Sequence, residues 1–167
     1  DVHHLERMLY SCLVDADYLD TEAFMQPEQS KLRGKHESLN VLESKLDAYL
    51  SKLKKNAPDT EVNKTRNQVQ SWCIKASEQT PDFYSLTVPT GGGKTLASVL
   101  WAIKHAVRNN LERIIIAIPY TSIITQTASV LRGILGEENV LEHHSNVDRT
   151  KIIDKELTQV QKLATEN

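Results

Sequence analysis

The segment "PTGGGKT", residues 89–95, places a lysine and a threonine directly behind three consecutive glycines. It follows the apolar run "FYSLTV" and precedes a run of helical periodicity, so it joins a predicted strand to a predicted helix. The backbone N–H groups around Gly91, Gly92 and Gly93 could turn inward as an anion-binding nest, and the helix N-terminus adds a partial positive charge. We therefore predict that residues 90–95 form a phosphate-binding loop.

Within this phosphate loop the polar side chains have distinct predicted roles. Lys94 would place its ammonium group on the β- and γ-phosphates of ATP, and the Thr95 hydroxyl would be a ligand of Mg²⁺. Thr90 opens the loop and belongs to the same predicted nucleotide site. The sequence departs from the full pattern at Val88, where the pattern has glycine. The alternative is a glycine turn that binds no ligand, but the context of strand, loop and helix favours a nucleotide.

The elements around the loop predict an α/β fold. Apolar periodicity indicates helices at residues 2–24, 39–55, 61–79, 94–109, 122–135 and 150–165. Apolar runs indicate strands at residues 83–88, 113–119 and 139–145. Alternating strands and helices predict a RecA-like parallel sheet with flanking helices, preceded by an all-α segment. The polar segment around Pro58 suggests a boundary that divides the chain into domains at residues 1–57 and 58–167.

Composition bounds the class of protein. The 167 residues are 40% hydrophobic and 25% charged with a formal net charge of -2, which is typical of a soluble globular chain and excludes binding of nucleic acid by bulk positive charge. Cys12 and Cys73 lie in unrelated apolar patterns, which favours reduced thiols in a cytoplasmic protein over a disulfide framework. We expect no membrane partner, because no apolar run approaches the roughly 20 residues of a membrane span.

Polar residues behind the second and third predicted strands suggest a site for a second ligand. Thr121, Ser122 and Gln126 lie at a predicted strand end and helix start, and His144 and Ser145 follow the next strand. Such groups can donate hydrogen bonds to the phosphates of single-stranded nucleic acid at the edge of an open sheet. The alternative, that Thr121 and Ser122 only cap a helix, stays open at this point.

Four segments together resemble a known family. These are "RMLYSCLVDADYLDTE", "SLTVPTGGGKTLASVLWAIKHA", "IIIAIPYTSIITQTASVLRGILG" and "NVLEHHS", which in this order resemble the CRISPR-associated helicase–nuclease of type I systems. The resemblance identifies "PTGGGKT" with motif I, "PYTSIITQ" with motif Ia and "EHHS" with motif Ib of superfamily 2 helicases. It also implies an adenine-reading glutamine in "NKTRNQVQ", with Gln70 as first choice and Gln68 as second. Solvent-facing glutamines on an amphipathic helix are the alternative.

The carboxylates of "LVDADYLD" take a role only from the resemblance. Spacing alone favours a surface position for Asp15, Asp17 and Asp20. The resemblance implies that this helix ends an HD-type nuclease domain, with Asp17, or failing that Asp15, as a ligand of a divalent transition metal such as Fe, Mn, Co or Ni. His3 and His4 lie about four helical turns from Asp17, too far away to share a metal ion with it, so we interpret them as ordinary histidines.

The resemblance implies an ATP- and Mg²⁺-dependent helicase that translocates on single-stranded DNA, with a metal-dependent nuclease, recruited by a guide-RNA surveillance complex in antiviral defence. The sequence ends before an Asp-Glu motif and a second helicase lobe, so we expect the chain alone to bind nucleotide with little ATPase or nuclease activity. Two alternatives stay open. One is a non-catalytic nucleotide-binding or docking module, and the other is a repair or restriction translocase of the same superfamily.

Overall fold

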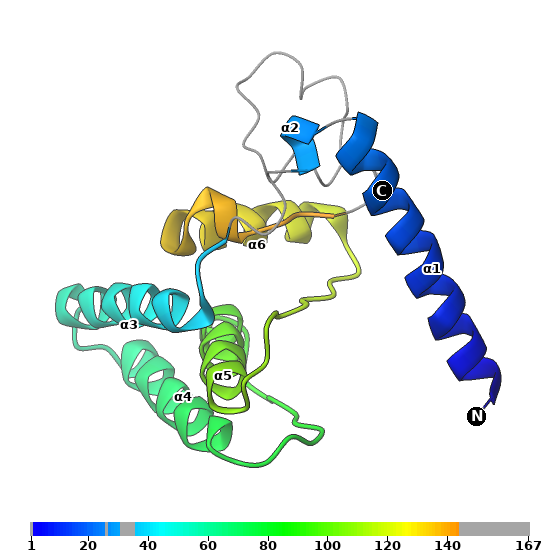
Figure 1. Ribbon diagram of the computed structural model, residues 1–167. Coiled ribbons are helices and arrows are strands. Elements are labelled where there is room, and N and C mark those ends of the chain that lie inside the picture. The colour runs from blue at the N-terminus through cyan, green and yellow to red at the C-terminus, as the bar shows by residue number, and fades with distance from the viewer. Residues whose placement is uncertain (1, 26, 31–35, 144–167) are drawn as a thin grey trace.

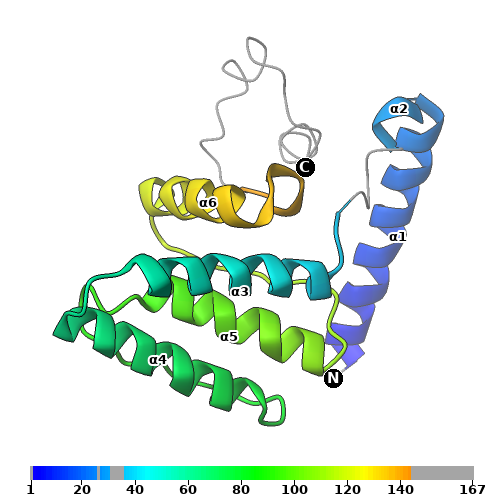
Figure 2. The same cartoon turned by 90° about the vertical axis from the view of Figure 1, so that its left-hand side faces the viewer.

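The computed structural model describes residues 2–25, 27–30 and 36–143 of the chain. Its elements, in chain order, are the helices α1 (Val2–Met25), α2 (Pro27–Ser30), α3 (Leu39–Asn56), α4 (Glu61–Ser77), α5 (Lys94–Arg108) and α6 (Thr121–Leu135), followed by the short 3₁₀ helix η1 (Glu137–Asn139) (Figure 1). Four of these helices form a stack in the order α6, α3, α5 and α4, with α1 to its side (Figure 2).

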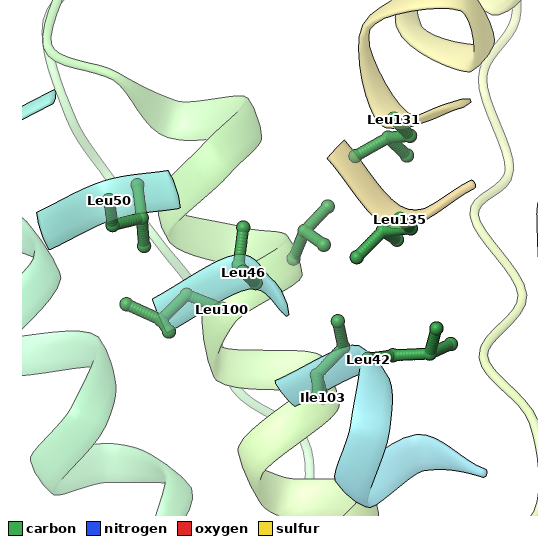
Figure 3. Packing of buried hydrophobic residues seen from close by; sticks show 8 residues of the cluster. Leu42, Leu46, Leu50, Leu100, Ile103, Leu131 and Leu135 are labelled. Atoms are coloured by element: carbon green, nitrogen blue, oxygen red, sulfur yellow. The ribbon is translucent and has the colours of Figure 1, made fainter. Parts of the chain in front are cut away.

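The centre of the stack is an aliphatic core between α3, α5 and α6. Leu42, Leu46 and Leu50 recur every four residues, so they lie on one face of α3. This face packs against Leu100 and Ile103 of α5 (Figure 3). Leu131 and Leu135 of α6 close the same cluster. Burial of this apolar surface stabilises the arrangement of the three helices.

A second, smaller core joins α4 to α5 and reaches the loop before α5. Val69 and Cys73 of α4 pack with Ala97 of α5 and with Val88, which precedes the phosphate loop. Trp101 lies against this cluster and stacks on His105 with ring centroids 4.9 Å apart. Burial raises the pKa of the Cys73 thiol, as expected for a thiol that serves as a small apolar group.

Polar contacts also hold α5 and η1 to α3. Lys104 Nζ of α5 donates to Glu43 Oε1 and Asp47 Oδ2, each at 2.8 Å. Burial alone would lower the pKa of Lys104, but the hydrogen bonds to Asp47 and Glu43 outweigh it and raise that pKa. At the start of α3, Glu37 pairs with Lys45 and accepts from Asn139 Nδ2 of η1 at 2.9 Å. These polar contacts fix the positions of α5 and η1 relative to α3, which the non-directional apolar contacts alone would not do.

Local sequence signals account for the helix ends. The Thr60 hydroxyl accepts from the Asn63 N–H at 3.3 Å and caps α4. Gly136 follows α6 with a φ of 105°, a backbone angle that favours glycine, and its N–H donates to the Arg132 carbonyl at 2.9 Å. The five long helices of the described chain match the helices predicted at residues 2–24, 39–55, 61–79, 94–109 and 122–135 to within a few residues. The helix predicted at residues 150–165 lies outside the described residues.

The predicted parallel sheet is wrong for this structure. In the described residues there is no β-strand, and residues 82–89 and 111–118 form neither helix nor strand. Several apolar side chains of these runs are exposed instead of covered on two faces, with Ile115 85% exposed and Phe83 fully exposed, whereas Val88 is buried against helices α4 and α5. A strand needs a partner for its N–H and C=O groups, and the described segments do not pair with one another. The fold class observed is therefore all-α, and the expectation of a RecA-like sheet is corrected.

Helix α1 forms as predicted but carries little packing. Its apolar side chains, including Leu5, Leu9 and Leu13, are exposed, and its main contact among the described elements is with α2. No described helix combines the length and the apolar character that crossing a membrane would require.

Candidate nucleotide-binding site

The phosphate loop begins with a tight turn. The Gly92 N–H donates to the Pro89 carbonyl at 3.0 Å, which closes a four-residue turn over residues 89–92. Gly91, the third residue of this turn, has a φ of 83°. A type II turn requires a positive φ at that position, which side chains with a Cβ seldom adopt. A Cβ on Gly91 would meet no atom within 4 Å, so the first glycine is not needed for space. It is needed for its backbone conformation.

The second glycine is needed for space. A Cβ on Gly92 would lie 2.3 Å from Val88 Cγ1 and 3.0 Å from the Pro89 carbonyl oxygen. Val88 is itself buried in the core between α4 and α5. The departure from the usual pattern at Val88 thus has a physical reason, since the valine anchors the start of the loop and Gly92 leaves room for it.

The third glycine begins α5 and leaves its N-terminus without a side-chain cap. Gly93 is the N-cap with a φ of 80° and ψ of 26°. The first helical hydrogen bond runs from the Ala97 N–H to the Gly93 carbonyl at 3.1 Å. The N–H groups of the first turn, including those of Lys94 and Thr95, precede this bond, and a glycine has no side chain to accept from them. A helix start of this kind attracts an anion through its N–H groups and its dipole.

Lys94 and Thr95 are exposed at this helix start, as a lysine and a threonine that meet a ligand must be. The Thr95 carbonyl accepts from Ser98 Oγ at 3.0 Å, which fixes the backbone of the first turn and leaves the Thr95 hydroxyl outside that bond. Thr90 is exposed in the turn that opens the loop. The structure therefore brings Thr90, the three glycines, Lys94 and Thr95 into one short loop. A triphosphate with Mg²⁺ fits this set of groups, because N–H donors, an ammonium and a hydroxyl suit its oxygens and its metal.

Sequence reasoning missed one residue of the site. Arg66 of α4 donates from Nε to the Gly91 carbonyl at 2.9 Å, across 25 positions of sequence. The sequence pattern around Arg66 predicts only an adenine-reading glutamine. Gln70 lies one helical turn further along α4 and is half-buried, whereas Gln68 is exposed. The signal that could have found Arg66 is its spacing of four residues from Gln70, which places both on one side of α4.

The residues predicted to contact nucleic acid lie at the start of α6. Thr121, Ser122 and Gln126 are exposed, and Ser122 and Gln126 share a face because they are four residues apart. The N-cap of α6 is Tyr120, with no side-chain cap bond, so the alternative that Thr121 or Ser122 is the capping residue is not observed. His144 and Ser145 lie outside the described residues.

Glu142, a described residue of the "EHHS" segment, contacts α6. Glu142, which directly precedes the histidine pair, accepts from Thr125 Oγ1 of α6 at 2.7 Å. The Glu142 carboxylate also accepts from Arg132 Nη1 at 3.0 Å, and both side chains of this ion pair are largely buried. Glu142, the first residue of the "EHHS" segment, is therefore hydrogen-bonded to α6, the helix that also carries Thr121 and Gln126.

The predicted metal ligand has no partners among the described residues. Asp17 is exposed on α1, as is its alternative Asp15. In the parts of the chain that the structure describes, no three His, Cys, Asp or Glu side chains lie close enough to hold a metal ion. His3 lies near Glu6 of the same helix, with 3.8 Å between Nδ1 and Oε2, and lies about 21 Å along the helix from Asp17. These residues alone do not fit a transition-metal site, and we derive no chemical step from them.

Comparisons with known proteins agree with the helicase motifs. The family model of the DEAD/DEAH box helicases matches residues 67–165, which include the phosphate loop, α5 and α6. Over 104 residues the chain is 35% identical to the CRISPR-associated nuclease/helicase Cas3 of Haloferax volcanii, an alignment that covers 51% of this chain and 11% of that relative. The two similarities confirm the resemblance found from the sequence motifs. Because the family model matches more than half of its residues, the chain belongs to the DEAD/DEAH box helicase family.

Proposed function

We propose that this chain supplies the ATP-binding loop of a helicase that translocates on single-stranded DNA in CRISPR antiviral defence. The observation that carries the proposal is the uncapped N-terminus of α5 behind a loop with two glycines at positive φ. Membership of the helicase family and the similarity to Cas3 support the link to ATP, Mg²⁺ and nucleic acid. Bound Mg·ATP would supply the free energy for movement along the strand.

In this proposal the residues of the loop bind different parts of Mg·ATP. The N–H groups of the first turn of α5 and the Lys94 ammonium bind the phosphates, and the Thr95 hydroxyl is a Mg²⁺ ligand. The turn at Thr90 and Gly91 presents the loop to the ligand. Gln70 reads the adenine, because an amide can pair with the N6 and N7 edge of that base.

The strand would lie along the start of α6. Thr121, Ser122 and Gln126 would donate to its phosphates, joined by His144 and Ser145. A chain with a net charge of -2 has to bind DNA through such local donors rather than through its overall charge. Recruitment by a guide-RNA surveillance complex would deliver the displaced strand, so that guide pairing reads the sequence.

The proposal also assigns a role to each of the two predicted domains. Residues 1–57 would belong to an HD-type nuclease domain and residues 58–167 to the helicase part, with Asp17 contributing to a metal site completed by residues of a longer protein. The chain spans 11% of the length of its Cas3 relative, so we expect the chain by itself to show neither DNA cleavage nor substantial ATPase activity.

The proposal is tested by calorimetric titration of Mg·ATP into the wild-type chain and into Lys94→Ala. Removing the Lys94 ammonium, which would donate hydrogen bonds to the phosphates, should weaken Mg·ATP binding by about 10- to 100-fold. Lys75→Ala is the matched control, because it removes the same charge from the exposed last turn of α4. A folded wild-type chain that binds no Mg·ATP, or a Lys94→Ala chain that binds as tightly as Lys75→Ala, would contradict the assignment. Single-stranded DNA, titrated with and without Mg·ATP, then tests the second ligand.

A further inference from the structure

Arg66 is connected to the phosphate loop through both its head and its stem. Its Nε donates to the Gly91 carbonyl at 2.9 Å. Its Cγ lies 3.4 Å from the position that a Cβ on Gly93 would occupy, and its Cβ and Cδ lie at 3.9 Å. The side chain therefore crosses the loop between the first and the third glycine. A residue at this place can set the shape of the loop without itself being part of it.

The guanidinium is held in place from its other side as well. Arg66 Nη1 donates to Asn63 Oδ1 at 3.2 Å, one turn earlier in α4. Asn63 is in turn fixed, because its Nδ2 donates to the Pro58 carbonyl at 2.9 Å and its backbone N–H donates to Thr60 Oγ1. Two bonds to a planar group fix both its position and its plane. A continuous chain of hydrogen bonds thus runs from Pro58 through Asn63 and Arg66 to Gly91.

The bond to Gly91 determines the direction of one peptide group. In a trans peptide the carbonyl of Gly91 and the N–H of Gly92 point in opposite directions. Arg66 binds that carbonyl, and the Gly92 N–H closes the turn on Pro89. A loop that binds phosphate through N–H groups must keep its carbonyl oxygens directed elsewhere, because an oxygen turned toward the phosphate would repel it. The Arg66 guanidinium gives the Gly91 oxygen another partner.

We propose that Arg66 is a positioning residue that holds the phosphate loop in its nucleotide-binding shape before nucleotide arrives. The inference rests on the proposed function, since it concerns the same loop. Without Arg66 the glycines regain backbone freedom, and binding of nucleotide has to order them again. The expected consequence is weaker nucleotide binding with an unchanged helical fold.

The test compares Arg66→Gln with Lys64→Gln in the full chain. Both variants remove one positive charge from an exposed position of α4, but Lys64 pairs with Glu61 at 2.9 Å and does not contact the loop. Arg66→Lys keeps the charge and one donor while losing the fork that also binds Asn63. Loop order is read without nucleotide from amide hydrogen exchange of Gly91–Lys94, and affinity is read from Mg·ATP calorimetry.

We expect Arg66→Gln to speed exchange of the loop amides and to weaken Mg·ATP binding by about five- to tenfold, the effect of one hydrogen bond from a charged donor at an exposed site. Arg66→Lys should recover part of both changes, and Lys64→Gln should stay within about twofold of wild type, the scale of a surface charge alone. Equal melting temperatures for Arg66→Gln and Lys64→Gln separate this role from support of the fold.

Unchanged loop exchange in Arg66→Gln would overturn the inference, and so would faster exchange with unchanged affinity. A wild-type chain that fails to bind Mg·ATP would instead overturn the proposed function. In that case the exchange measurement still decides whether Arg66 holds the loop, so the two failures are distinguishable.

Discussion

The contact between Val88 and Gly92 allows a sharp test of how the phosphate loop is built. A methyl group added at Gly92 would lie 2.3 Å from Val88 Cγ1, far inside the normal separation of two carbon atoms of about 3.5–4.0 Å. Its next contact, with the Pro89 carbonyl oxygen at 3.0 Å, is tight but much less so. The Gly92→Ala clash therefore arises mainly from one methyl of one neighbouring side chain, and a second substitution can remove that methyl.

The expected magnitudes follow from this geometry. Gly92→Ala alone should lower the free energy of unfolding by about 2 kcal/mol, within the usual cost of overpacking a filled site. Val88→Ala alone should cost about 2 kcal/mol as well, because it removes two buried methyl groups. In the double variant the added and removed groups compensate in part. We expect a coupling free energy of about 1–2 kcal/mol in favour of the double variant.

Urea unfolding of the four chains, followed by circular dichroism, measures this coupling. Gly133→Ala is the control, because a Cβ at Gly133, exposed on α6, meets no atom within 4 Å and should stabilise the helix by about 0.5–1 kcal/mol. Additive effects of Gly92→Ala and Val88→Ala would refute the reasoning, since they would mean that the two positions do not share space.

Two further predictions concern the rest of the fold. Leu46→Ala should lower the free energy of unfolding by about 3–5 kcal/mol, because Leu46 is completely buried in the core that α3 forms with α5. Urea unfolding measures this loss, with Leu53→Ala as the control at an exposed position of α3. Equal losses in the two variants would contradict the assigned core. The hydrogen bond from Lys45 lowers the pKa of Glu37; burial opposes this shift and the hydrogen bond from Asn139 assists it. The ionised Glu37 should therefore contribute to the free energy of unfolding above the ordinary glutamate range near pH 4.3. This contribution should be lost as the pH falls through the lower folded-state pKa. Urea midpoints measured from about pH 6 to pH 3 should therefore fall less in Glu37→Gln than in wild type, and identical pH profiles would count against the pairing.

The success of the sequence predictions follows how local each signal is. The leucines at positions 42, 46 and 50 repeat at helical spacing within one segment, and α3 forms as this spacing predicts. The phosphate loop is also a contiguous pattern, and α5 begins at Lys94 as the pattern predicts, whereas phosphate binding by these residues stays a prediction. In both cases neighbours in sequence carry the whole signal.

The predictions that failed or were incomplete depend on distant partners. An apolar run such as the one containing Ile115 indicates a preference for extended backbone, but a sheet also requires another segment to pair with it. That pairing is absent from the described residues, where Ile115 is exposed. Arg66 and Gly91 lie 25 positions apart, so no spacing rule connects them. The same holds for Val69 and Val88, which meet only because α4 packs on α5.

Helix α4 replaces the expected strand neighbours as the support of the loop. It holds the loop at two places, since Val69 and Cys73 pack on Val88 at its start while Arg66 binds Gly91 inside it. It also packs along α5, whose N-terminus completes the loop. A change of loop shape on nucleotide binding therefore has to be accommodated either by a shift of α4 or by release of Arg66. Because α4 also carries Gln70, the residue proposed to read the adenine, the proposed base contact and the order of the phosphate loop would be coupled through a single helix.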